Sequence, residues 1–195
     1  ADGRDPWQVF EEVGFIGNTR VDPCSRILKR ELMDRWRDEH CDPSVTTLYY
    51  GIDWTEIHRL ERVRQRVPEW TIEAPMTEPP SINKSQMLAW CKDEGIEPPR
   101  LYAMGFAHNN CGGFCIKSGQ AQFQLLLRQM PERYAYHEKR EAEVAAKIGT
   151  DCSILRDRTR NKTKPLTLRQ FRERLEMQPD LFDRFDFGGC GCAME

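Results

Sequence analysis

The chain has 195 residues, a formal net charge of −2 and eight cysteines, and 39% of its residues are hydrophobic. This length suffices for a buried core without disulfides, and the polar composition excludes collagen-like and membrane-spanning proteins. The first residues contain neither the basic nor the apolar region of a signal peptide, so we expect a cytoplasmic protein. The absence of an initiator Met is consistent with processing or with excision from a longer chain. In a reducing compartment, clustered cysteines indicate metal, iron–sulfur or thiol chemistry more often than disulfides.

Apolar spacing and capping signals predict a chain rich in helices and poor in strands. Strands are predicted at 45–50 and 70–74, with a short extended segment at 101–106. The predicted helices cover residues 7–13, 25–37, 53–66, 83–95, 120–128, 131–148 and 167–177. Strands followed by helices favour an α/β arrangement. Two or three strands are few for a doubly wound sheet of this length, and missing N-terminal strands would explain the small number.

The segment 50–59 places Gly51 and a helix start directly after a predicted strand. Asp53 and Glu56 form a capping pattern, and backbone N–H groups at such a turn hold phosphates or nucleotides in α/β folds. Arg59 lies one turn inside the helix, within reach of an anion. The alternative is an ordinary strand-to-helix turn, with Glu56 as a capping residue and a solvated Arg59.

Five of the eight cysteines are candidates for chemistry. The pairs Cys111-x3-Cys115 and Cys190-x-Cys192 lie beside glycines that let the backbone fold closely around a metal or a cluster. Cys24 precedes a predicted helix, whose dipole is expected to lower the pKa of its thiol. Metal or cluster ligation is the favoured interpretation, with a redox thiol, a disulfide or no role as alternatives. The cysteines expected to be inert packing residues are Cys41, Cys91 and Cys152.

Two further features suggest contacts with anions. Lys117 follows the first cysteine pair and is a candidate anion contact, although the glycine order of a Walker A loop is absent. Residues 156–174 contain eight Lys or Arg and two acidic residues, which is typical of a nucleic-acid or phosphate contact or of a solvated loop. The candidate nucleic-acid contacts there are Arg156, Arg158, Arg160, Lys162 and Lys164. No Ser-His-Asp order, H-E-x-x-H motif or acid–base carboxylate pair occurs, so no catalytic residue is assigned.

Three segments, in this order, resemble motifs of the phosphoadenosine phosphosulfate reductase-like group of the PP-loop, or adenine nucleotide α-hydrolase-like, superfamily. The segment 22–29, D-P-C-S-R-I-L-K, resembles the group's C-S-x-x-L-K motif, and 50–59 resembles its Y-x-G-I-x-x-x-E-x-x-R turn. The segment 75–115, with L-Y-A-M-G-F before its two cysteines, resembles the proline, helix, L-Y-x-x-G-F and C-x-x-C elements. The last element is widened here to C-x3-C. The resemblance covers roughly residues 20–135.

The resemblance implies a Rossmann-like (HUP-type) three-layer α/β domain that binds ATP or another adenine nucleotide. Members of the group reduce activated sulfate, or adenylate a substrate and install sulfur on tRNA or DNA. Several hold a 4Fe–4S cluster, and the matching ligands here would be Cys24, Cys111 and Cys115, with a fourth from Cys190 or Cys192. By the same resemblance, Glu56 and Arg59 would lie near the nucleotide or the substrate.

Two departures qualify the resemblance. The S-G-G-x-D-S phosphate loop and the E-C-G-I-H tail of the group are absent from this chain. We therefore expect the C-terminal part of such a protein, with the phosphate loop supplied by an N-terminal segment or another subunit. Residues 1–150 would form the α/β portion with the cysteine site, and 151–195 a basic linker, a helix and a cysteine-containing tail. The alternative is a non-catalytic, zinc-stabilised module that binds nucleic acid.

Overall fold

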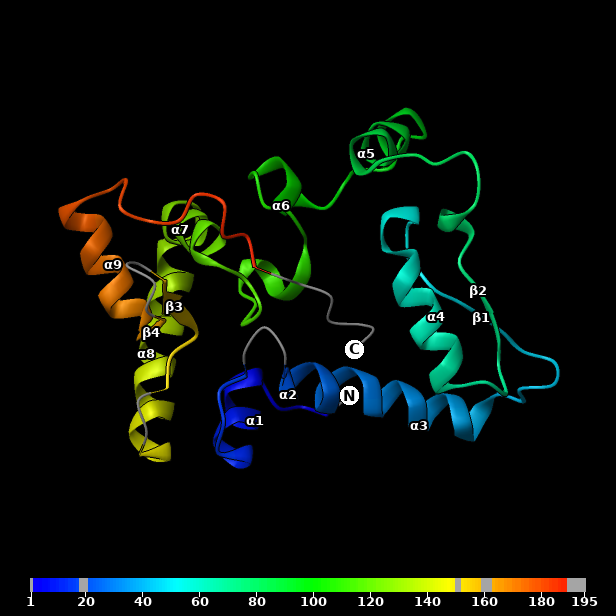
Figure 1. Ribbon diagram of the computed structural model, residues 1–195, viewed down its shortest axis with the longest axis horizontal. Coiled ribbons are helices and arrows are strands. Elements are labelled where there is room, and N and C mark those ends of the chain that lie inside the picture. Colours follow the sequence, from blue (N-terminus) through cyan, green and yellow to red (C-terminus); the bar gives the residue numbers. More distant parts are fainter. Residues whose placement is uncertain (1, 18–20, 150–151, 159–162, 189–195) are drawn as a thin grey trace. The chain divides into compact units, whose positions relative to one another are not determined.

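The computed structural model describes the chain except for residues 1, 18–20, 150–151, 159–162 and 189–195 (Figure 1). The described chain is a mixed α/β protein in which helices predominate, so the predicted fold class is confirmed at this level. It divides into two compact units. Among the described residues, unit 1 contains 2–32 and 99–188, and unit 2 contains Met33–Pro98. The predicted division at residue 150 falls inside unit 1.

Unit 1 is mainly helical, with one short antiparallel strand pair. Its elements are α1 (Pro6–Val13), α2 (Pro23–Ser25), the π-helical turn η1 (Arg26–Arg30), α6 (Arg100–Ala103), the 3-10 turn η4 (Asn110–Gly113), α7 (Gln120–Gln129), α8 (Pro131–Ile148), β3 (Leu155–Asp157), β4 (Lys164–Leu166) and α9 (Leu168–Met177). The long helix α8 contacts α1, α7 and α9 (Figure 1). The apolar faces of these helices meet in one core, which includes the fully buried Phe10, Phe123 and Phe171.

A buried carboxylate joins α8 to the strand pair. Glu141 is 2% exposed and accepts hydrogen bonds from the N–H groups of Ile154, at 2.9 Å, and Leu168, at 2.6 Å. Burial raises the pKa of Glu141 to about 7, although both hydrogen bonds oppose this shift. The carboxylate satisfies one donor before β3 and one at the start of α9, and so fixes both elements to α8.

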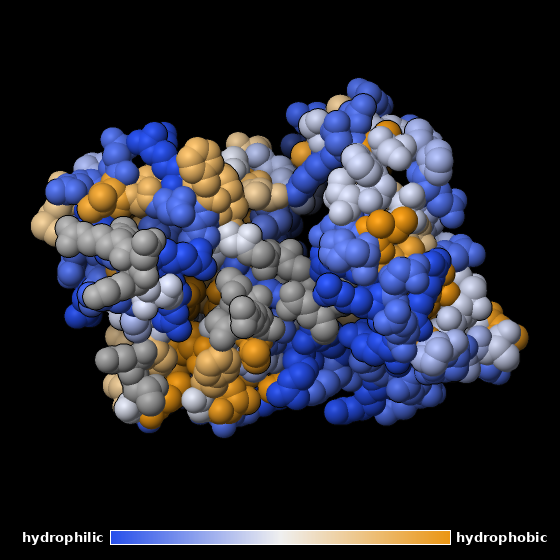
Figure 2. Space-filling view, viewed as in Figure 1, coloured by the Kyte–Doolittle hydropathy of each residue, from blue (hydrophilic) through white to orange (hydrophobic). Residues whose placement is uncertain are grey.

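Unit 2 is a strand–helix–strand unit followed by a helix. Its elements are β1 (Thr47–Tyr49), the 3-10 turn η2 (Trp54–Glu56), α4 (Ile57–Arg66), β2 (Thr71–Glu73), the 3-10 turn η3 (Pro75–Thr77) and α5 (Lys84–Asp93), and α3 (Glu31–His40) crosses the boundary at Leu32. β1 and β2 are parallel, with Leu48 opposite Ile72. The α4 residues Leu60 and Val63 are buried in one small core with Ile72. The surface over α3 and α4 is largely hydrophilic (Figure 2).

Most predicted helices and strands are present, and the prediction for the segment 101–106 is wrong. Residues 100–103 form α6 instead of the predicted extended segment. Pro99 begins this helix, and Gly105 ends the turn with a φ of +87°. The predicted apolar stripe of residues 25–37 is also not a core face, because Trp36 is 59% exposed. Within the described residues, none of the helices combines the length and apolar character needed to cross a membrane.

Candidate metal centre

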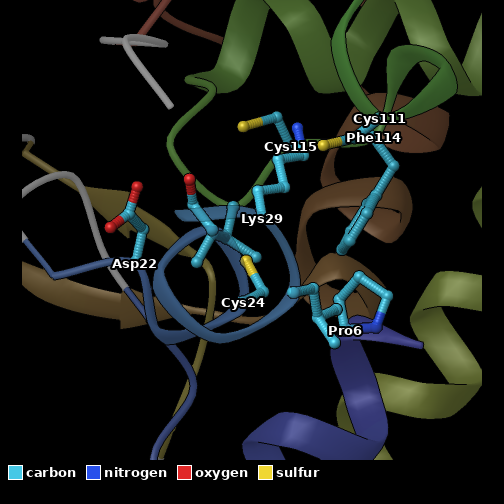
Figure 3. Close-up of a pocket in the computed structure, with 10 residues that line it drawn as sticks. Pro6, Asp22, Cys24, Lys29, Cys111, Phe114 and Cys115 are labelled. Atoms are coloured by element: carbon cyan, nitrogen blue, oxygen red, sulfur yellow. The ribbon is translucent and has the colours of Figure 1, made fainter. Parts of the chain in front are cut away.

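Three cysteines from two distant segments line one cavity of unit 1 (Figure 3). Cys24 comes from α2, Cys111 from η4, and Cys115 from the loop that follows η4. The cavity has about 440 Å³ of empty space, counted out to its open mouth. The other residues that line it are Pro6, Asp22, Ser25, Leu28, Lys29, Phe114 and Ile116. The structure therefore brings together the three described members of the predicted cysteine set.

A left-handed turn brings the two loop cysteines to this cavity. Cys111, Gly112 and Gly113 have φ values of +51°, +61° and +90°, a region that glycine enters without strain. A Cβ atom on Gly113 would lie 2.8 Å from Met130 Cε, the flexible end of a side chain that can move aside, so the φ of +90° and not this contact favours glycine at 113. Arg133 Nη2 donates to the carbonyl oxygen of Cys111 at 3.0 Å. The C-G-G-F-C sequence thus permits a compact turn that an ordinary residue at 113 would strain.

Burial dominates the protonation of Cys24. Removal from water, together with the nearby Cys111 and Asp22, raises the pKa of its thiol to about 11. The Lys29 ammonium lowers this pKa, but by less than burial raises it. The prediction that the helix dipole lowers the pKa of Cys24 is therefore wrong. A helix dipole has this effect on a thiol at a solvated helix end, whereas the Cys24 thiol is largely removed from water. A metal cation would add to the positive charge of Lys29 and favour the thiolate forms of the cysteines in this cavity.

Charged side chains lie around the cysteine-bearing segments. Figure 3 shows Lys29 extending toward Cys111 and Cys115. Asp22 accepts from Arg30 Nη2 at 3.1 Å, and Lys117 Nζ lies 3.8 Å from Asp22 Oδ2. Lys117, a predicted anion contact, is 1% exposed, so it lies inside the fold.

An aromatic group closes one wall of the cavity. The ring of Phe114 stacks on His137, with 3.5 Å between the ring centroids. His137 Nδ1 accepts from Trp7 Nε1 at 3.0 Å. Burial lowers the pKa of His137 to about 3, so the imidazole is neutral near pH 7. The wall behind Phe114 therefore adds no positive charge to the cavity.

The predicted nucleotide contacts at the strand-to-helix turn lie in unit 2. Asp53 Oδ1 accepts from the N–H of Thr55 at 2.8 Å and caps η2. Glu56 does not complete a capping box and instead pairs with Arg59. A Cβ atom on Gly51 would meet no atom within 4 Å, so the turn has no steric need for glycine. The predicted set of Gly51, Asp53, Glu56 and Arg59 is therefore local to one turn, and Lys117 belongs to unit 1.

Two of the three predicted nucleic-acid contacts that the structure describes, Arg156 and Arg158, have side-chain partners within unit 1. Arg156 Nη1 donates to Ser153 Oγ at 2.7 Å, and Arg158 lies 3.7 Å from Asp186. Further along the basic block, Arg172 and Arg174 pair with Glu138 and Asp157. Lys164 is exposed and makes no ion pair with a described residue. The remaining predicted contacts lie outside the described residues and are Arg160 and Lys162.

The other cysteines that the structure describes do not line the cavity. Cys41 and Cys91 are half-buried in unit 2, and Cys152 is half-buried against the core of unit 1. The tail pair, Cys190 and Cys192, lies outside the described residues.

The chemistry of the three cavity cysteines fits a soft metal or an iron–sulfur cluster. Among the described residues, no three His, Cys, Asp or Glu side chains are already arranged to hold a metal ion. The thiols must therefore draw together and lose protons as a metal binds. Comparisons with family models, curated proteins and solved structures found no match for this chain.

Proposed function

We propose that this chain is the cluster-binding part of a PP-loop-type enzyme resembling the phosphoadenosine phosphosulfate reductases. Its reaction would be sulfonucleotide reduction or adenylation-dependent sulfur transfer to tRNA or DNA. The observation that supports this proposal is the meeting of Cys24, Cys111 and Cys115 in one cavity. Thiolates are the usual protein ligands of iron–sulfur clusters, and the buried Phe114, Cys115 and Ile116 would shield one side of such a cluster in a cavity that is open at its mouth.

The residues of the cavity would perform three tasks. Cys24, Cys111 and Cys115 would bind as thiolates, and Lys29 would favour the ionised form of Cys24. Phe114 and Ile116, each 3% exposed, would exclude water from one side. A bound cluster would supply electron transfer or a site that accepts sulfur. The fourth ligand is expected from Cys190 or Cys192.

Unit 2 would supply contacts to the adenine nucleotide. Its parallel β1–α4–β2 arrangement is compatible with part of a Rossmann-like domain, in which ligands bind where strands end and helices begin. Arg59 would exchange its pairing with Glu56 for an anionic group of the nucleotide. The phosphate loop itself would come from another segment or subunit.

Anaerobic purification followed by iron, sulfide and zinc analysis tests the proposed cofactor. We expect iron and acid-labile sulfide in stoichiometric amounts, together with the visible absorption of a 4Fe–4S cluster. Stoichiometric zinc in a colourless protein would instead favour the zinc-stabilised module, and a folded, metal-free protein would contradict both.

A nucleic-acid titration at several salt concentrations tests whether nucleic acid is a substrate or partner. The ion pairs of Arg158, Arg172 and Arg174 leave few of the described side chains of the basic block 156–174 for phosphate contacts. A sulfonucleotide reductase should therefore bind nucleic acid weakly, with a shallow dependence on salt. Tight binding that weakens steeply with salt, and that is lost on neutralising Lys162 and Lys164, would favour sulfur transfer to nucleic acid or the nucleic-acid-binding module, which the metal analysis separates.

A further inference from the structure

The segment that follows α9, residues 178–188, is here called the strap, and it caps the start of α7. The N–H of Gln120 donates to Asp186 Oδ2 at 3.2 Å, and the N–H of Ala121 donates to the Asp186 carbonyl oxygen at 3.0 Å. The first N–H groups of a helix have no partner within the helix, and a carboxylate there also favours the helix dipole. One strap residue therefore satisfies two donors of α7.

Two glycines allow the strap to approach the chain before α7. A Cβ atom on Gly119 would collide with the carboxylate of Asp186. A Cβ atom on Gly188 would collide with the carbonyl oxygen of Lys117, and Gly188 has a φ of +72°. The backbones of the strap and of residues 117–119 are thus in direct contact.

Gln120 fastens the strap to the strand pair as well. Its side chain is almost fully buried, and its Nε2 donates to the Arg156 carbonyl oxygen at 2.9 Å. The Oε1 atom of the same side chain accepts from the N–H of Asp183 at 3.2 Å. Arg158 lies 3.7 Å from Asp186 Oδ1 on the other side. The strap is therefore held at Asp183 and Asp186 by Gln120 of α7, and at Asp186 also by Arg158, which follows β3.

The chain held by the strap leads directly to the cysteine cavity. Cys115 is 3% exposed, and its carbonyl oxygen accepts from the N–H of Ser118 at 2.9 Å. This turn ends at Ser118, and the next residue, Gly119, lies against Asp186. Cys115 is thus one end of a short turn, and the strap fixes the other end.

We propose that Asp186 is a positioning residue for the cysteine site: by capping α7 it holds the Cys115–Gly119 turn so that Cys115 lines the cavity. The role in metal binding rests on the proposed function, whereas the effect on Cys115 does not. Loss of the cap frees the turn, exposes the Cys115 thiol and weakens any metal site that uses it. Residues that orient metal ligands typically change metal affinity by about 10- to 100-fold when they are removed.

Cysteine alkylation in metal-free protein, followed by peptide mass spectrometry, tests the positioning role directly. Asp186→Ala should label Cys115 several-fold faster than the wild type, while the labelling of Cys152 serves as an internal reference. Asp186→Asn keeps an oxygen acceptor for the Gln120 N–H and should restore slow labelling. The matched strap control is Asp180→Ala, because the Asp180 side chain pairs with the exposed Arg184.

A destabilised control separates positioning from general loss of stability. Val144→Ala weakens the core of unit 1 on α8 without removing a hydrogen bond at Glu141, Gln120 or Asp186, and should leave Cys115 labelling at the wild-type rate. Equal labelling in the wild type and Asp186→Ala, or equal acceleration in Val144→Ala, would overturn the proposal.

Metal titration of the same variants separates this inference from the proposed function. We expect Asp186→Ala to bind iron or zinc about 10- to 100-fold more weakly than the wild type. Wild-type affinity in Asp186→Ala would overturn the role of Asp186 at the metal site while leaving the proposed function standing. A wild type that binds no metal, with fast Cys115 labelling in Asp186→Ala, would retain the positioning role and contradict the proposed function.

Discussion

Unit 1 is assembled from both ends of the described chain, whereas unit 2 is one continuous segment. In unit 1, α1 from the N-terminal part packs on α8, and this long-range packing accompanies the meeting of Cys24 with Cys111 and Cys115. In unit 2, the turn at Asp53 and the pairing of Glu56 with Arg59 are interactions between near neighbours. The candidate metal site thus depends on tertiary packing, while the candidate nucleotide turn depends on local structure.

The largest predicted effect is the loss of a core aromatic residue from unit 1. Phe123 is fully buried, so Phe123→Ala should cost about 3–5 kcal/mol through lost burial and a cavity. Hydrogen exchange followed by mass spectrometry should show reduced protection in α7 and α8. The matched change in unit 2 is Leu60→Ala, which should reduce protection in α4 and β2. Equal loss of protection in both units from either variant would contradict the division into two cores.

A medium effect is expected at the buried carboxylate of unit 1. Glu141→Gln replaces one acceptor oxygen with an amide that cannot accept from a backbone N–H, which should cost about 1–3 kcal/mol at pH 7. Chemical denaturation followed by circular dichroism measures this loss. A change below the error of such a measurement would show that Glu141 does not hold β3 and α9.

The pH dependence of stability tests whether burial or hydrogen bonding dominates at Glu141. Its folded pKa of about 7 lies above the usual glutamate value of 4.5, so the folded state binds the proton more tightly than the unfolded chain. The stabilisation is fully present below pH 4.5 and is lost as the pH rises through 7. The advantage of the wild type over Glu141→Gln should therefore shrink between pH 5 and pH 8. An advantage that grows over this range would mean that the hydrogen bonds outweigh burial.

The smallest predicted effect is at the turn of unit 2. Glu56→Gln removes the carboxylate charge that pairs with Arg59, and its side chain is 40% exposed. Partly exposed pairs of this kind contribute about 0.3–0.5 kcal/mol. Thermal unfolding should therefore show a small shift only. A loss comparable to that of Leu60→Ala would mean that the pair is part of the fold of unit 2 and not only a feature of its surface.

Local signals in the sequence predicted most helices well. The helix predicted at 83–95 begins with a capping box at Asn83, and α8 spans the predicted 131–148. The segment 101–106 was misread because its apolar and aromatic residues suit a strand, whereas Pro99 and Gly105 delimit one short helix. Local composition could not decide between these outcomes.

The candidate site was only partly predictable. The order of the motifs and the spacing of Cys111 and Cys115 indicated a shared site, but the raised pKa of Cys24 depends on burial by distant segments. The ion pair between Asp22 and Arg30 was not predicted, although Asp22 stands two residues before Cys24. Asp186 was not predicted either, because Gln120, whose N–H donates to it, is 66 residues away in the chain. Such contacts follow from tertiary packing and leave no periodic signal in the sequence.

Cluster loading in single cysteine variants tests most directly whether both ends of the chain build one metal site. After anaerobic reconstitution, Cys24→Ser, Cys111→Ser and Cys115→Ser should each lose the iron, the sulfide and the visible absorption that the wild type retains. Cys41→Ser, Cys91→Ser and Cys152→Ser should load like the wild type, because these residues do not line the cavity. Full loading of Cys24→Ser, or equal loss in all six variants, would contradict a site shared by Cys24, Cys111 and Cys115.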